Sequence, residues 1–151
     1  MLIKTTRASL FAIALSLATT FIPGMAIGVE ASAAATTVSA DQIRSQWATM
    51  KKSYLDSVAS LAGQPQHSAV IQEYNVALED TGKSLEAFIA LKQTTPPVAT
   101  TVMTPAVDQL VKNLSRLKAL QGKAKGNLVT IIGGALKQQQ QITQNAIKNM
   151  R

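Results

Sequence analysis

The chain has no cysteine and a single histidine, His67, in 151 residues. Without cysteine it has no disulfide, no thiolate nucleophile and no lipid-modified cysteine. A metal-binding helix motif would place an acidic residue three or four positions from the histidine, and His67 has no such neighbour. Close to Pro65 at the head of a predicted helix, His67 is expected to be solvated. We therefore expect no catalytic residue, no metal ligand and no bound cofactor, and we interpret the protein as a non-enzyme.

Aromatic residues are also scarce, at 4% of the chain, and none lies in the basic region after Gln109. Modules that read nucleic-acid sequence combine basic residues with aromatic side chains or with a recognition helix. The segment IIGGALK lacks both the spacing and the preceding strand of a phosphate-binding glycine loop. We expect no sequence-specific nucleic-acid binding. The one tryptophan, Trp47, falls on an apolar stripe and is expected in the core.

Acidic residues are missing from the C-terminal part of the chain. From Gln109 to Arg151 there are eight Lys and Arg and no Asp or Glu, whereas Ala34 to Asp108 has five against seven. Such asymmetry suggests a polyanionic partner, such as an anionic envelope polymer, a lipid surface or an acidic protein. The alternative is that the basic segment packs beside the acidic one and leaves a mildly basic surface.

The N-terminus, residues 1–33, has the layout of a secretory signal peptide. Lys4 and Arg7 precede an uncharged stretch that is too short for a comfortable membrane span, and small residues follow at cleavage spacing. Cleavage is expected after Ala26 or Ala33; the alternative is an uncleaved anchor. The protein is thus expected to be secreted or periplasmic in a bacterium, with a small-residue linker at 34–40 and one helical domain at 41–151.

Two amphipathic helices are predicted at about 41–62 and 67–93. Ser39 and Gln42 form a capping-box pattern before the first, and Gly63 and Pro65 end it. The second carries a heptad-like, coiled-coil type of seam. The apolar seam positions are Ile43, Trp47, Met50, Tyr54, Val58 and Leu61, then Ile71, Tyr74, Leu78, Thr81, Leu85 and Phe88.

A long amphipathic helix is predicted at about 105–150, after a non-helical loop at 94–103. Thr104 and Pro105 form a helix start signal. Gly122 and Gly126 could split the helix, but its apolar residues keep one phase through both glycines, which favours a continuous helix. The glutamine run 138–141 is interpreted as helical surface. The fold is predicted to be all-α: a small antiparallel helical bundle of three helices, or of four if the last is broken at Gly122–Gly126.

The basic residues of this last helix fall on the side opposite its apolar stripe. The leading hypothesis is an exported binding or adaptor protein of the bacterial envelope or extracellular space, with this face towards an anionic surface or an acidic partner. One alternative is a secreted membrane-active effector that uses the cationic helix. Another is a self-assembling structural protein, and a homo-oligomer remains open. The candidate binding residues are Lys112, Arg116, Lys123, Lys137, Lys148 and Arg151.

Overall fold

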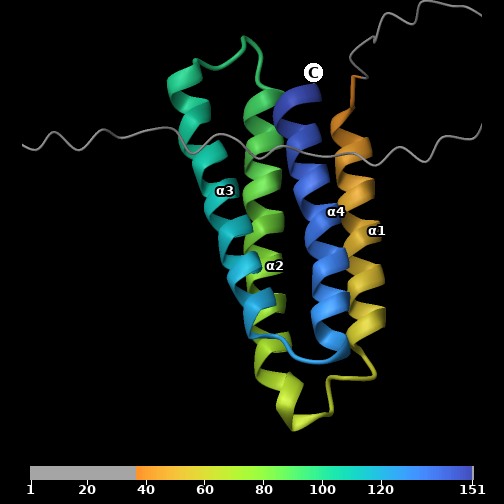
Figure 1. Cartoon of the computed structure of the whole chain (residues 1–151). Helices are drawn as coiled ribbons and strands as arrows, with labels where there is room; N and C mark the ends of the chain where they lie inside the picture. The colour runs from red at the N-terminus through yellow and green to blue at the C-terminus, as the bar shows by residue number, and fades with distance from the viewer. Residues whose placement is uncertain (1–36, 151) are drawn as a thin grey trace, which may run out of the picture. The chain divides into compact units, whose positions relative to one another are not determined.

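A computed structural model describes residues 37–150, which form an antiparallel four-helix bundle (Figure 1). Successive helices run in opposite directions, so that the start of α1 and the end of α4 lie at the same end. The predicted signal peptide and Arg151 lie outside the described residues. The helices are α1 (Ala40–Val58), α2 (Pro65–Lys92), α3 (Thr100–Lys123) and α4 (Asn127–Asn149).

One apolar core runs along the bundle axis, and each helix contributes one face to it. The closest neighbours are α2 with α3 and α1 with α4, while α3 also packs on α4 and α1 on α2. Burial of these faces is the main favourable term for a cysteine-free domain of this size. The largest fully buried apolar side chains are Tyr74, Phe88, Ile43, Leu78, Leu85, Ile89, Leu110, Leu117, Leu128 and Ile132.

The start of α1 confirms the predicted capping box. The Ser39 hydroxyl accepts a hydrogen bond from the Gln42 amide at 3.1 Å, and the Gln42 side chain accepts one from the Ser39 amide at 2.9 Å. The preceding residue, Val38, is buried, and its amide donates to the Asn149 carbonyl at 3.0 Å. This bond ties the entrance of α1 to the last residue of α4.

The continuous C-terminal helix favoured by the sequence is wrong, and the four-helix alternative is correct. α3 ends at Lys123 and α4 begins at Asn127, with a turn in which Gly126 has a φ of 56°. Glycine adopts this left-handed conformation without the penalty that a side chain would bring. The shared apolar phase misled the prediction because both arms of the hairpin bury their stripes in the same core.

The start of α3 also differs from the prediction. The helix begins at Thr100, so that Pro105 lies inside it and the segment Thr100–Met103 is helical. Pro105 is thus the sixth residue of α3, where proline leaves the Thr101 carbonyl without its intrahelical amide donor. The Thr104 hydroxyl donates to the Thr100 carbonyl at 3.0 Å, which gives that carbonyl a further partner.

Two polar side chains expected in solvent are buried. His67 is only 8% exposed, and its Nδ1 atom has no hydrogen-bond partner. Gln139, from the predicted glutamine surface, is fully buried and hydrogen-bonds to Tyr74, whereas its neighbours Gln138 and Gln140 are exposed. Both errors arise because residue type was used to judge solvation, whereas helix phase places these side chains towards the core.

Trp47 lies at the edge of the core, half-buried between α1 and α2. A Cβ atom at Gly82 would lie 2.9 Å from the Trp47 indole nitrogen, so that the missing side chain of Gly82 makes room for the indole ring. The glycine in the middle of α2 costs helix stability but allows α1 and α2 to approach here.

Candidate functional site

Five of the six predicted basic residues lie in the described bundle, and they belong to two antiparallel helices, α3 and α4, and not to one continuous helix. Two of them pair with acids of α2: the Arg116 guanidinium lies 2.9 Å from the Asp80 carboxylate, and Lys123 lies 3.1 Å from Glu73. Arg151 lies outside the described residues. The other three, all exposed, have no ion-pair partner between residues 37 and 150: they are Lys112, Lys137 and Lys148.

The acids of α2 form two rows with seven-residue spacing, one towards each neighbouring helix. Glu73 and Asp80 pair with α3, as described above. On the other side, Glu79 pairs with Lys51 of α1, and Glu86 with Arg44 at 3.0 Å. Seven residues bring a helix back to nearly the same face, so that each row stays in reach of one partner helix. The acidic and basic segments therefore do neutralise each other in part.

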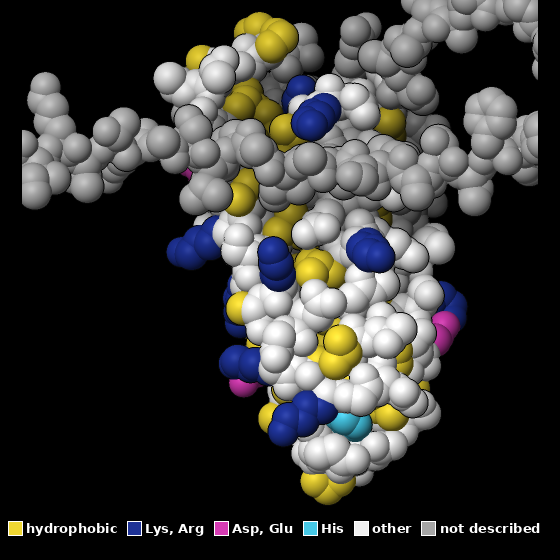
Figure 2. Space-filling model, in the orientation of Figure 1, with side chains coloured by type: hydrophobic (Ala, Val, Ile, Leu, Met, Phe, Trp, Pro, Cys, Tyr) yellow, Lys and Arg dark blue, Asp and Glu magenta, His cyan; other side chains and the backbone are white. Residues whose placement is uncertain are grey.

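These ion pairs leave more lysines than acids without a partner, and we call this excess the surplus of lysine. Of the seven acids between residues 37 and 150, only Asp108 has no ion-pair partner. In Figure 2 the basic side chains are spread over the face in view, while acidic ones show only at its margins. The lysines of this part of the chain without an ion-pair partner are Lys83, Lys92, Lys112, Lys118, Lys125, Lys137 and Lys148.

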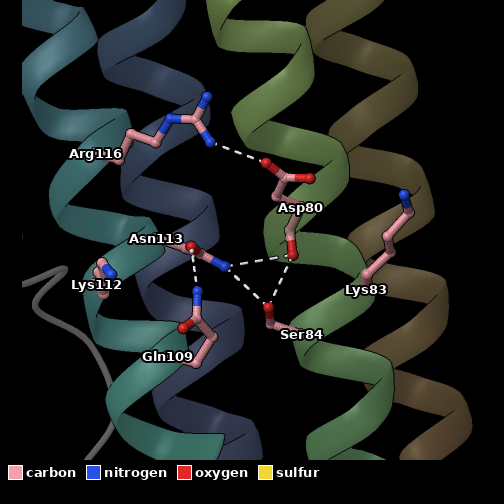
Figure 3. A pocket seen from close by; sticks show the side chains of 7 residues that line it. All are labelled: Asp80, Lys83, Ser84, Gln109, Lys112, Asn113 and Arg116. Carbon is pink, nitrogen blue, oxygen red and sulfur yellow. Dashed lines mark hydrogen bonds and ion pairs between the residues drawn. The ribbon is translucent and has the colours of Figure 1, made fainter.

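One groove lies where this surplus meets the α2–α3 seam (Figure 3). It is open to solvent and encloses about 660 Å³. We call it the α2–α3 groove. Its lining has three cations and one acid, and the acid is already paired with one of the cations. The lining residues are Asp80, Lys83, Ser84, Gln109, Lys112, Asn113 and Arg116.

The floor of the α2–α3 groove is a connected set of hydrogen bonds around Asn113, which is only 6% exposed. Its side-chain nitrogen donates to the Ser84 hydroxyl at 2.9 Å and to the Asp80 carbonyl at 3.3 Å. Its side-chain oxygen accepts a hydrogen bond from the side-chain amide of Gln109 at 3.0 Å. The Ser84 hydroxyl in turn donates to the Asp80 carbonyl at 2.9 Å. These bonds fix the floor before any ligand arrives.

Two lysines flank this floor, Lys83 from α2 and Lys112 from α3. Both are exposed and neither has a carboxylate partner among the described residues. The paired row of α2 acids stops at Asp80, because the next position with seven-residue spacing is Ala87. The seam thus changes from ion pairs to unpaired lysines of like charge, which creates a positive potential in the groove.

A second groove lies between α1 and α4 and has no charged side chain in its lining. Its lining is polar and uncharged, with Met50 and Ile142 as its apolar members. The remaining side chains are amides and hydroxyls, which hold no fixed charge. The polar lining residues are Ser45, Gln46, Thr49, Gln138, Gln141 and Asn145.

Comparison of the chain with known protein families, with curated proteins and with solved structures finds no match in any of the three. Within residues 37–150, no group of three or more His, Cys, Asp or Glu side chains is placed to hold a metal ion. None of the four helices carries an apolar stretch of the length and hydropathy that crossing a membrane requires.

Sequence reasoning found Lys112 and Arg116 but missed the α2 side of the groove. Lys83 lies in the acidic half of the chain and was not considered as a binding residue. Asn113 interrupts a stripe of leucines on α3, and a polar residue at a core position is a signal that could have marked the seam. The seven-residue spacing of Glu73 and Asp80 is a second such signal.

Proposed function

We propose that this is a non-enzymatic binding protein of the bacterial envelope or extracellular space that attaches to anionic partners through its surplus of lysine. The observation that carries the proposal is the imbalance of unpaired charges in the described bundle: seven lysines against one aspartate. Nearly all acidic side chains of the described bundle form ion pairs within it, so that the electrostatic potential around the bundle is positive. The cellular location rests on the signal-peptide pattern in residues 1–33.

Surface attraction of this kind is long-ranged but sensitive to salt. The Debye length falls to about 10 Å at 0.1 M salt, so that exposed lysines act together only at low ionic strength or on a multivalent partner. Each lysine adds little by itself, since an exposed ion pair is worth about 0–1 kcal/mol. The proposal therefore favours an extended anionic partner over a small anion.

The test is binding of the processed protein to anionic and neutral vesicles and to a soluble polyanion over a range of salt concentrations. We expect attachment to the anionic partners alone, with affinity that falls steadily between about 0.05 and 0.2 M salt. An affinity that does not change with salt concentration, or equal binding to neutral vesicles, would contradict the proposal.

A membrane-active effector is the second candidate, and one observation favours it. α4 makes no ion pair with another helix among the described residues, whereas α1, α2 and α3 are linked by four. Its apolar face is buried in the bundle, with Leu128 and Ile132 fully inaccessible, so that α4 must leave the bundle to insert. Release of a dye trapped in anionic vesicles would support this function, and adsorption without leakage would support the first.

A further inference from the structure

The geometry of the α2–α3 groove points to a specific ligand class: we propose that the groove binds a linear phosphate polymer, with Lys83 and Lys112 as its principal contacts. The inference rests on the proposed function, since it names the ligand of the same positive surface. It adds the position of the binding site, two contact residues and the chemical class of the ligand, and each of these can be tested separately.

The location follows from the way in which charge is left uncompensated. Along the rest of the α2–α3 seam, Lys123 of α3 pairs with Glu73 of α2, and within the groove Arg116 pairs with Asp80. The other two cations of the groove, Lys83 from α2 and Lys112 from α3, have no carboxylate partner among the described residues. Lys83 and Lys112 lie on opposite sides of the groove, so that a polyanion lying across it would meet both positive charges.

The shape of the site favours a chain over a flat surface or a free ion. The groove is a hollow between two helices, and its hydrogen-bonded floor lies between the two lysine side chains that flank it. A flexible polymer can reach the polar floor between the two lysines, whereas a planar membrane surface cannot enter the hollow and meets the lysines alone. A free anion would gain little, because one exposed ion pair strengthens binding by less than about fivefold. A polymer keeps several charges in contact at once.

The free cations of the groove are of a type that binds phosphate. A guanidinium fork matches carboxylate and phosphate alike, and the one arginine of the groove, Arg116, already holds the carboxylate of Asp80. The two free cations are lysine ammonium groups, which act as point charges and suit the tetrahedral oxygens of phosphate. The site thus has its guanidinium occupied by Asp80 and its two ammonium groups open to phosphate.

The experiment uses inorganic polyphosphate as the probe and the double variant Lys83→Gln/Lys112→Gln as the test. The matched control is Lys137→Gln/Lys148→Gln, which removes the same charge from exposed positions on α4. We expect the groove variant to bind polyphosphate about tenfold more weakly and the control less than about threefold more weakly, since diffuse charge alone gives small effects. The slope of log affinity against log salt should fall by about 1.5 in the groove variant, close to 0.7 per lost contact.

Each remaining outcome decides one part of the proposal. Equal losses in the two double variants would overturn the groove as the site and leave the lysine surplus as a general anionic surface. Polyglutamate that binds as tightly as polyphosphate, with the same dependence on Lys83 and Lys112, would overturn the choice of phosphate. Absence of polyphosphate and vesicle binding by the unaltered protein at low salt would overturn both the groove and the proposed function. Circular dichroism melting of each variant ensures that only folded protein is compared.

Discussion

The Tyr74 hydroxyl and the Gln139 side-chain amide hydrogen-bond to each other in the buried centre of the bundle, with 3.0 Å between the amide nitrogen and the hydroxyl oxygen. Both side chains are fully inaccessible to solvent. The same Gln139 nitrogen lies 3.7 Å from the Met50 sulfur, so that this contact joins α1, α2 and α4. A buried polar pair of this kind fixes the register of helices that apolar contacts alone would specify less sharply.

Tyr54 and Tyr74 give a matched pair of deletions. Their rings lie 4.8 Å apart, yet the Tyr54 hydroxyl is buried without a partner, whereas that of Tyr74 is bonded. We expect Tyr74→Phe to lower the free energy of unfolding by about 1–3 kcal/mol, because it leaves Gln139 unpaired in the core. Tyr54→Phe should leave stability unchanged or raise it. Urea denaturation measures both, and an equal loss in the two variants would contradict the assignment.

The two tyrosines also predict a loss of stability in alkali. Burial raises the pKa of Tyr74 from 10.0 to about 12, against a smaller lowering by the Gln139 hydrogen bond, and burial raises the pKa of Tyr54 further. Between these values the folded state holds protons that the unfolded state releases. The stabilisation is therefore complete below pH 10 and falls as the pH rises towards 12.

Urea midpoints measured at several pH values from 9 upwards, at constant ionic strength, test this dependence. The comparison is with Tyr54→Phe, which retains every other ionisable group of the chain. The variant should lose stability less steeply than the unaltered protein above pH 10. Parallel curves would show that ionisation of Tyr54 contributes nothing to alkaline unfolding.

The turn between α3 and α4 should distinguish two glycines that look alike in the sequence. Gly126 has a positive φ, and Gly126→Ala should destabilise the protein by about 1 kcal/mol or more. Gly122 is helical with open space around its Cα, and Gly122→Ala should stabilise the protein by about 0.5–1 kcal/mol. Thermal melting of both variants measures the difference, and opposite signs are required.

A gain of binding is expected when the carboxylate of the groove is neutralised. Asp80→Asn frees the Arg116 guanidinium and should strengthen polyphosphate binding about three- to tenfold, with a stability loss below about 1 kcal/mol. Asp108→Asn makes the same change in net charge at an acid with no ion-pair partner in the described bundle. A gain of the same size in both variants would mean that net charge, and not the groove, sets the affinity.

The sequence predicted the helices well where local rules decide. The seam from Ile71 to Phe88 and the capping box at Ser39 both appear as expected, because helix period and cap chemistry depend on nearby residues. The turn after Lys123 was missed because a stripe in constant phase is equally compatible with one helix and with a hairpin that buries both arms.

The candidate site was predicted only in part, for a different reason. Lys112 and Arg116 were found on α3, but their surroundings depend on which residues of α2 lie opposite, and the sequence does not state that alignment. Arg116 turned out to have a carboxylate partner and Lys112 did not. Whether a lysine is free to bind is therefore a property of helix register, which composition and charge counts do not contain.

The hydrogen bond from Val38 to Asn149 makes the four helices a nearly closed ring. A short covalent link at this point would join α4 to α1, and a new opening in the exposed loop between Lys92 and Thr100 would give the order α3–α4–α1–α2. Every interhelical ion pair and the Tyr74–Gln139 bond would remain in such a permuted chain, while α2 and α3 would become its most distant elements. The α2–α3 groove would then be formed by the first and the last helix of the permuted chain, and its three-dimensional structure would be unchanged.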